Sequence, residues 1–343
     1  MKAVAYQASH PIDHPDALID TILPDPVAQG RDLLVEVRAV SVNPVDTKVR
    51  KGSQPENGAW KVLGWDAAGV VRAVGPEVTR FKPGDRVWYA GSILRQGSNS
   101  ELQLVDERIV GAMPASLDFA DAAAMPLTSL TAWEMLFDRL QVPMNVDGAE
   151  SAADKGRSLL IVGAAGGVGS IMVQLARNLT ALTVIGTASR PESQEWVRKL
   201  GAHQVIDHSQ PLSAELARVG AAAPDYIVSL THTDQHYAEI VEAIAPQGRF
   251  GLIDDPEPID VRQLKRKSVS LHWELMFTRS IFQTDDMQAQ QDILSRIAGL
   301  VDAGTVASTA TERFGVINAA NLKRAHALLE SGRSRGKIVL AGF

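Results

Sequence analysis

Apolar and polar residues alternate along the first third of the chain with the two-residue period of β-strands. Residues 33–40 alternate in this way, and residues 67–74 form an apolar run interrupted by glycine. The turn signal Pro83-Gly84-Asp85 precedes another apolar run at residues 86–89, and residues 1–6 also have the pattern of a strand. These patterns predict a compact, turn-rich β unit in the N-terminal third.

The period of the pattern changes near Ser129. From there, apolar residues recur at the spacing of a connecting helix, namely Leu130, Trp133, Leu136, Phe137 and Leu140. Residues 145–156 are polar and predict an exposed loop. Strand and helix patterns then alternate, with strands expected at residues 158–162, 182–190, 204–206, 225–230, 249–253 and 268–273. This alternation predicts a doubly wound parallel sheet.

The pattern of the C-terminal tail differs again. Residues 316–330 predict a helix and residues 336–340 a final strand, which we expect to return to the N-terminal β unit. A chain of 343 residues exceeds what one hydrophobic core usually organises. We therefore expect an α/β protein of two domains, one formed by residues 1–126 and 300–343 and the other by residues 127–299. Ligands tend to bind between domains, so the cleft between them is the expected active site.

A glycine-rich segment follows the first strand of the expected parallel sheet. Gly166 would let the backbone approach a pyrophosphate, and Gly169 would let the following helix pack against the strand. The helix N-terminus adds unpaired N–H groups and the positive end of the helix dipole. Ala164 stands where the usual fingerprint has its first glycine. We expect the dinucleotide to be bound by Ala165, Gly166, Gly167 and Val168.

The end of the second strand indicates which dinucleotide binds. An acidic residue about twenty positions after the loop would hold the ribose of NAD, and none is present. Ser189 and Arg190 occupy this region, and a guanidinium can form a bidentate pair with a 2′-phosphate. NADPH is therefore the expected cofactor. The alternative is that Ser189 caps the next helix while Arg190 is solvated.

Composition removes several classes of function. The chain has no cysteine, which excludes disulfides, thiolate metal sites and a cysteine nucleophile. A net charge of −6 argues against nucleic acid as the main partner. No apolar run approaches the roughly twenty residues of a membrane span, and the N-terminus has no signal-peptide pattern. We expect a cytoplasmic protein without a membrane or nucleic-acid partner.

Several segments, in this order, resemble the medium-chain dehydrogenase/reductase superfamily and within it the quinone oxidoreductase branch. They are residues 41–46 (SVNPVD), 64–69 (GWDAAG), 83–87 (PGDRV), 126–134 (PLTSLTAWE) and 164–169 (AAGGVG). Residues 64–66 and 271–279 (LHWELMFTR) further resemble the subgroup called zinc-type alcohol dehydrogenase-like proteins. The resemblance covers nearly the whole chain. It implies a GroES-like, β-rich catalytic domain and a Rossmann NAD(P)-binding domain.

The zinc named in that subgroup is not expected here. Zinc-dependent relatives hold the metal with cysteine and histidine, but Asn43 stands at the first cysteine position and Trp65 at the histidine position. The remaining carboxylates, Asp46 and Asp66, make a poor zinc site without soft or imidazole ligands. We expect no bound metal.

The resemblance also implies residues of the active site. Asn43 and Thr128 would lie near the nicotinamide and the acceptor oxygen, and Trp65 would form a wall of the cleft. Alternatively, Asn43 begins a turn before Pro44 and Thr128 caps the helix that follows. For Asp46 we expect a structural role, in which the carboxylate anchors a neighbouring backbone group.

Further cofactor contacts are implied beyond the phosphate loop. They are Leu230, Thr231, Leu252 and Ile253 after two of the sheet strands, Lys337 near the nicotinamide, and His208 beside the 2′-phosphate. For Lys337 the alternative is a solvated side chain near the chain terminus, and for His208 a surface histidine.

Together these features predict a zinc-independent, NADPH-dependent oxidoreductase that reduces quinones or α,β-unsaturated carbonyls by hydride transfer. We expect a homodimer, because residues 268–273 form an apolar strand predicted last in its sheet and an open edge invites pairing. Two alternatives remain, a zinc-dependent alcohol or aldehyde dehydrogenase and a non-catalytic NADPH-binding structural or RNA-binding protein.

Overall fold

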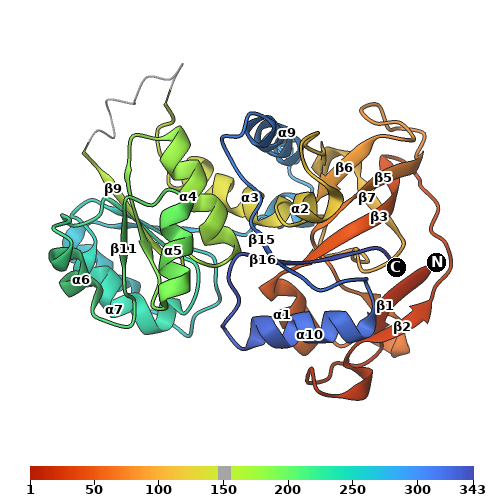
Figure 1. Cartoon of the computed structure of the whole chain (residues 1–343), viewed down its shortest axis with the longest axis horizontal. Helices are drawn as coiled ribbons and strands as arrows, with labels where there is room; N and C mark the ends of the chain where they lie inside the picture. Colours follow the sequence, from red (N-terminus) through yellow and green to blue (C-terminus); the bar gives the residue numbers. More distant parts are fainter. Residues whose placement is uncertain (146–155) are drawn as a thin grey trace. The chain divides into compact units, whose positions relative to one another are not determined.

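The computed structural model describes residues 1–145 and 156–343, and the loop expected at residues 145–156 therefore lies almost entirely outside the described residues. The chain forms two compact units, shown in Figure 1. Unit 1 consists of Met1–Leu130 and Phe277–Phe343, and unit 2 of Thr131–Met276. The expected α/β class, with a GroES-like β-rich domain and a Rossmann domain, is confirmed.

Unit 1 is built around the long strand β3 (Asp32–Val42), which pairs antiparallel with β5, β7 and β16. Its alternating side chains explain this central place, because Leu33, Val35 and Val37 point into the core. The seven-stranded sheet has the order β15-β16-β3-β5-β6-β8, with β7 on β3. The other members are β5 (Ala67–Val74), β6 (Arg86–Tyr89), β7 (Leu102–Asp106), β8 (Val110–Ala112), β15 (Ala310–Arg313) and β16 (Lys337–Ala341).

A smaller sheet and several helices complete unit 1. The small sheet has the order β2-β1-β4, with β1 (Lys2–Tyr6), β2 (Ile19–Ile22) and β4 (Lys61–Val62). The helices are α1 (Pro44–Gly52), α2 (Phe119–Ala123), α8 (Thr278–Phe282), α9 (Ala289–Asp302) and α10 (Ala319–Glu330). Helix α3 (Pro126–Trp133) and the π-helical stretch Glu134–Arg139 carry the chain into unit 2 and account for the predicted connecting helix.

Unit 2 contains the predicted parallel sheet. Its order is β11-β10-β9-β12-β13-β14, and every pair of neighbouring strands in it is parallel. The strands are β9 (Ser158–Val162), β10 (Thr183–Thr187), β11 (Gln204–Ile206), β12 (Tyr226–Ser229), β13 (Arg249–Leu252) and β14 (Ser270–Trp273). The helices are α4 (Gly167–Leu179), α5 (Pro191–Lys199), α6 (Leu212–Arg218) and α7 (Thr233–Ala243). The chain order reverses between β9 and β12, the point where such sheets bind ligands.

The return to unit 1 occurs earlier than the expected residue 300. The compact unit takes up the chain again at Phe277, so residues 277–299 belong to unit 1. The reason is the packing of α9 on β8: a side chain at Gly111 would collide with Leu294, and Arg80 donates a hydrogen bond to Gln291. The amphipathic pattern of α9 is visible in the sequence, but it does not say which domain the helix covers.

One buried histidine makes the stability of unit 1 depend on pH. His326 lies in α10, which packs beside α1 (Figure 1). Its side chain is fully buried, and neither ring nitrogen has a hydrogen-bond partner among the described residues. Burial, together with the charges of Arg50 and Lys51, lowers the pKa of His326 to about 3.

We expect this histidine to weaken the fold in mild acid. In the unfolded chain His326 takes up a proton near pH 6.5, and in the folded chain only near pH 3. The neutral histidine therefore adds nothing unfavourable above pH 6.5, and the free energy of unfolding decreases as the pH falls below that value. At pH 5.5 the loss is about 1.4 kcal/mol relative to pH 7.5. Urea unfolding of the native chain and of His326→Leu at both pH values measures it. Parallel changes in the two proteins would contradict the assignment.

Candidate active site

Three buried polar side chains meet in unit 1 at the end of β3. Asn43 is the residue before the first turn of α1, Asp66 directly precedes β5, and Lys337 begins β16. The antiparallel register pairs Ile338 with Val42, which places Lys337 beside Asn43. All three side chains are at most 3% exposed. The fold thus brings a lysine of the tail to residues from the first third of the chain.

The lysine of this cluster uses all its hydrogen-bond donors inside unit 1. Its Nζ donates to Val42 O at 3.1 Å, to Asp66 Oδ2 at 2.9 Å and to Asn43 Oδ1. A lysine ammonium has three donors, so none remains for a ligand in this arrangement. The solvated side chain considered for Lys337 is therefore not what the structure describes.

The amide of Asn43 is held in one orientation. Its Nδ2 donates to Asp66 Oδ2 at 2.8 Å and to Trp65 O at 3.3 Å, while its Oδ1 accepts from Lys337. The two amide hydrogens are thereby both used. Asn43 thus connects the ion pair to the junction between β3 and α1.

Asp66 is the centre of the cluster and also holds a helix. Its Oδ1 accepts the backbone N–H of Leu127 at 2.8 Å, in the first turn of α3. Burial raises the pKa of Asp66, whereas the ammonium of Lys337 and the hydrogen bonds to Leu127 and Asn43 lower it. All its partners donate, which is the pattern of an ionised carboxylate. Sequence reasoning considered Asp66 only as a poor zinc ligand and missed this ion pair.

Asp46 anchors the backbone beside the cluster. Its Oδ2 accepts the backbone N–H of Asn43 at 2.7 Å, across the first turn of α1, which is the structural role expected from the sequence. The pKa of Asp46 is raised to about 7, mainly by burial. The hydrogen bond from Asn43 and the charge of Lys337 oppose this rise, and the charge of Asp66 adds to it.

The other two residues implied for catalysis are also buried. Thr128 lies inside α3 and donates to Met125 O at 3.1 Å, so it is not the residue that begins the helix. Trp65 is fully buried, its Nε1 donates to Ser92 O at 3.2 Å, and its ring meets Phe277 edge-on. Trp65 therefore packs inside unit 1 with its one polar group satisfied.

These contacts do not fit a zinc ion. Asn43 stands where zinc-dependent relatives have a metal ligand, and both Asn43 and the neighbouring carboxylate Asp66 accept hydrogen bonds from the Lys337 ammonium. An ammonium held at this donor set would repel a divalent cation. Across residues 1–145 and 156–343, no group of three or more His, Cys, Asp or Glu side chains is placed to hold a metal.

The phosphate loop of unit 2 has the geometry that its glycines require. Gly163 directly follows β9 with φ of +85°, in the left-handed region that glycine adopts without strain. The N–H of Gly166 donates to Gly163 O at 3.1 Å, which closes a turn before α4 begins at Gly167. Ala165, Gly166, Gly167 and Val168 are half-buried, so their backbone remains accessible at the helix N-terminus. The loop therefore fits a dinucleotide pyrophosphate, and Gly163 is a member that sequence reasoning missed.

Ser189 and Arg190 follow β10 at the same edge of the sheet. Ser189 is exposed, and the residue that precedes the first turn of α5 is Arg190, whose side chain does not cap the helix. The capping role considered for Ser189 is therefore not the one the structure describes. The Arg190 guanidinium is 3.5 Å from Glu192 and donates to Ser193 Oγ at 3.4 Å, and the side chain as a whole is 37% exposed, so a ligand can reach it.

The remaining residues implied for the cofactor in unit 2 lie at the ends of three further strands of the sheet. Leu230 and Thr231 lie against the phosphate loop, where a Cβ on Gly163 would be 3.0 Å from Thr231. Leu252 is fully buried in the core, so only its backbone could contact a cofactor, while Ile253 is half-buried. His208 follows β11, is half-buried, and its Nδ1 is 3.1 Å from Thr187 Oγ1. It is therefore not the fully solvated surface histidine considered as the alternative.

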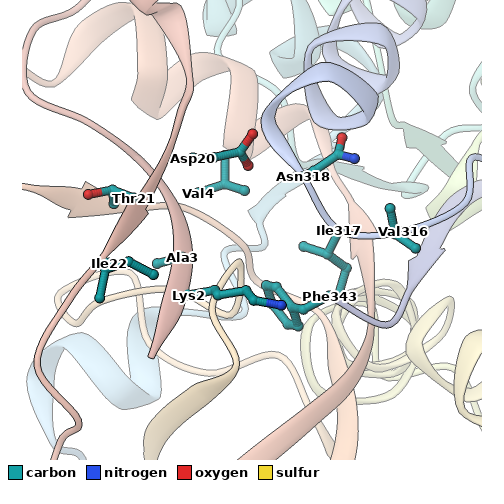
Figure 2. Close-up of a pocket in the computed structure, with 10 residues that line it drawn as sticks. All are labelled: Lys2, Ala3, Val4, Asp20, Thr21, Ile22, Val316, Ile317, Asn318 and Phe343. Atoms are coloured by element: carbon teal, nitrogen blue, oxygen red, sulfur yellow. The ribbon is translucent and has the colours of Figure 1, made fainter.

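A separate cavity in unit 1 involves none of these residues. Figure 2 shows it between β1, β2 and the segment near the C-terminus, with Ile22, Ile317 and Phe343 among its lining side chains. Its volume is about 360 Å³.

Among the described helices, none has the length and apolar character needed to cross a membrane.

Comparisons with known proteins give concordant matches. One family model, described as an alcohol dehydrogenase GroES-like domain, matches residues 29–123, and another, described as a zinc-binding dehydrogenase, matches residues 200–340. A zinc-type alcohol dehydrogenase-like protein of Staphylococcus aureus is 41% identical over 316 residues, which cover 92% of each chain.

Two other matches extend over similar lengths. A quinone oxidoreductase of Pseudomonas aeruginosa is 31% identical over 316 residues, covering 90% of this chain and 91% of that protein. A crystal structure from Rhizobium etli, provisionally described as a zinc-dependent alcohol dehydrogenase protein, is 59% identical with a TM-score of 0.94. The match covers 100% of this chain and 98% of the Rhizobium etli chain.

Proposed function

Since this chain belongs to the medium-chain dehydrogenase/reductase superfamily, with zinc-type alcohol dehydrogenase-like proteins and quinone oxidoreductases as relatives, we propose that it is a zinc-independent, NADPH-dependent reductase of quinones or α,β-unsaturated carbonyls. The observation that carries the proposal is the buried cluster of Asn43, Asp66 and Lys337. The Lys337 ammonium is bound by Asn43, at the position of a metal ligand in zinc-dependent relatives, and by the neighbouring Asp66.

The same cluster favours an acceptor that stabilises its own charge. Lys337 and the amide of Asn43 have no donor left for a substrate oxygen, and Thr128 donates to its own helix. A simple carbonyl would need a strong electrophile to accept a hydride, whereas a quinone or enone delocalises the added charge. The role of Asn43 and Lys337 is then to position the end of β3.

The NADPH supplies the hydride when it is bound, and unit 2 supplies its binding site. The N–H groups at the start of α4 would hold the pyrophosphate, and Arg190 would pair with the 2′-phosphate. The exposed guanidinium and the absence of an acidic residue at the end of β10 support NADPH over NADH.

The proposed activity can be tested by following NADPH oxidation against panels of quinones, enones and aldehydes. We expect turnover with quinones or enones that is unchanged after treatment with a metal chelator. Reduction of simple aldehydes that depends on stoichiometric zinc would favour an alcohol dehydrogenase. Tight NADPH binding without turnover, combined with salt-sensitive RNA binding, would favour a binding protein.

Arg190→Asp is expected to weaken NADPH binding by at least tenfold and to leave NADH binding unchanged or tighter. The variant loses a charge-assisted pair to the 2′-phosphate, and its carboxylate would repel that group while accepting from a ribose hydroxyl. Fluorescence titration with both cofactors measures the change. Arg198→Asp, at an exposed position of the same helix α5, is the matched control and should bind both cofactors as the native chain does.

We also propose a homodimer that pairs through β14. This strand is at the edge of its sheet, and the side chains of Trp273 and Leu275 remain 53% and 52% exposed. An uncovered edge with exposed apolar side chains supports association with a second copy. Light scattering of the purified protein measures the mass, and a monomer at micromolar concentration would rule the dimer out.

A further inference from the structure

Three histidines gather at the carboxyl edge of the parallel sheet in unit 2. His208 follows β11, while His232 precedes α7 and His236 lies within it. The rings of His208 and His236 meet edge-on, with centroids 5.7 Å apart. The glycine-rich fingerprint at residues 164–169 does not predict that these histidines lie close together, and only the folded structure shows it.

The cluster is connected to the phosphate loop by hydrogen bonds. The backbone N–H of Gly163 donates to Thr187 Oγ1 at 3.0 Å, and the same oxygen is 3.1 Å from His208 Nδ1. Because Thr187 Oγ1 already accepts one hydrogen, its own hydroxyl hydrogen can be donated to Nδ1. His208 then carries its hydrogen on Nε2, as a neutral imidazole.

Burial favours the neutral imidazole at two positions of the cluster, His208 and His236, in the free protein. Burial lowers the pKa of His208, His232 and Arg190 lower it further, and Asp207 raises it. Burial also lowers the pKa of His236, as do His208 and His232.

Two carboxylates act in the opposite direction on His236. Asp234 and Asp254 both raise its pKa without overcoming the burial. Asp254 accepts two hydrogen bonds from Thr233, at the first turn of α7, and so is already engaged. A dianion next to the rings would be a much stronger local charge than these partners provide.

We propose that His208 and His236 form, with Arg190, a proton-coupled subsite for the 2′-phosphate of the cofactor, so that binding of NADPH takes up a proton and binding of NADH does not. The inference rests on the proposed use of NADPH. No metal explains the cluster, because the described residues hold no group of His, Asp or Glu arranged to bind one.

The expected pH dependence has a definite sign. A bound phosphate would raise the pKa of His208 and His236 above their values in the free protein. The resulting gain in NADPH affinity is complete at low pH and is lost as the pH rises. A shift of one pKa unit corresponds to about a tenfold change in affinity. We therefore expect NADPH to bind about tenfold more tightly at pH 6.5 than at pH 8.

The phosphate itself would produce the opposite trend. Its second pKa is near 6, so acidification removes charge from the ligand and weakens its pairing with Arg190. Tighter binding on acidification thus separates titration of the histidines from titration of the ligand.

Calorimetric titration of the full chain with NADPH and with NADH, at pH 6.5 and pH 8 and in two buffers of different ionisation enthalpy, counts the protons. Native protein should take up a proton with NADPH alone. His208→Gln and His236→Gln should each reduce both the uptake and the pH dependence. His203→Gln is the matched control, because His203 lies before β11, at the opposite end of that strand.

Two adverse outcomes are distinguishable. If NADPH binds but native protein takes up no proton, or the His208 and His236 variants take up as much as the native chain, the subsite is refuted while NADPH use stands. If NADPH fails to bind at either pH, both the subsite and the proposed function are overturned.

Discussion

Replacing Lys337 by methionine is expected to lower the free energy of unfolding by about 3 to 5 kcal/mol, because it leaves a buried carboxylate without its counter-charge. The Asp66 carboxylate pairs with the Lys337 ammonium at 2.9 Å, and neither side chain is more than 3% exposed, so water cannot replace the lost ammonium. Urea unfolding at pH 8 measures the change. A loss below about 1 kcal/mol would contradict a buried ion pair and would indicate a solvated lysine.

The destabilisation caused by Lys337→Met should depend on pH and on the presence of the Asp66 carboxylate. Without the ammonium, the pKa of Asp66 rises further above its unfolded value, so the destabilisation grows as the pH rises from 5 to 8. Adding Asp66→Asn to Lys337→Met removes the orphaned charge and should restore part of the stability. A double variant less stable than Lys337→Met would show that the carboxylate is held by its other partners.

Gly169→Ala is expected to destabilise unit 2 by about 3 kcal/mol, at the upper end of what overpacking usually costs. A Cβ at this position would lie 2.5 Å from Gly163 O and 2.6 Å from the backbone of Ala164. Both contacts involve backbone atoms of the loop that follows β9, which a rotamer change cannot relieve. Thermal unfolding measures the loss, and an unchanged midpoint would disprove the close approach of α4 to this loop.

Gly166→Ala is the matched variant and should affect binding instead of stability. Its backbone angles, φ −74° and ψ −178°, are open to alanine, and the nearest atom to a new Cβ is Gly163 O at 3.5 Å. The added methyl group would stand between the backbone and a pyrophosphate. We expect native stability with NADPH affinity reduced at least tenfold, and unchanged affinity would place the phosphates elsewhere.

The dinucleotide half of the protein was predictable because its signals are local. A strand, a glycine-rich turn and an amphipathic helix follow one another between Ser158 and Leu179, and each is recognisable from neighbouring residues. The alternation of strand and helix also predicted that the sheet is parallel, whereas the return of β12 to the side of β9 was seen only in the structure. The edge position of β14 was predicted on the same grounds.

The polar cluster of unit 1 was not predictable in the same way. Asp66 and Lys337 are 271 positions apart in the chain, and Asn43 and Lys337 are 294 apart. Their contact depends on the antiparallel register of β16 on β3, which a one-residue shift would abolish. The sequence alone therefore left Lys337 between a cofactor contact and a solvated side chain.

Period and glycine spacing along the chain were thus enough to predict a β unit, a parallel sheet and the phosphate loop, because these depend on interactions within a few residues. The superfamily was identified separately, from the resemblance of several short segments. The pairing of Lys337 with Asp66, the placement of α9 on unit 1 and the gathering of His208 and His236 required the folded chain. They depend on strand register and on packing between distant segments, and no short stretch of sequence encodes either.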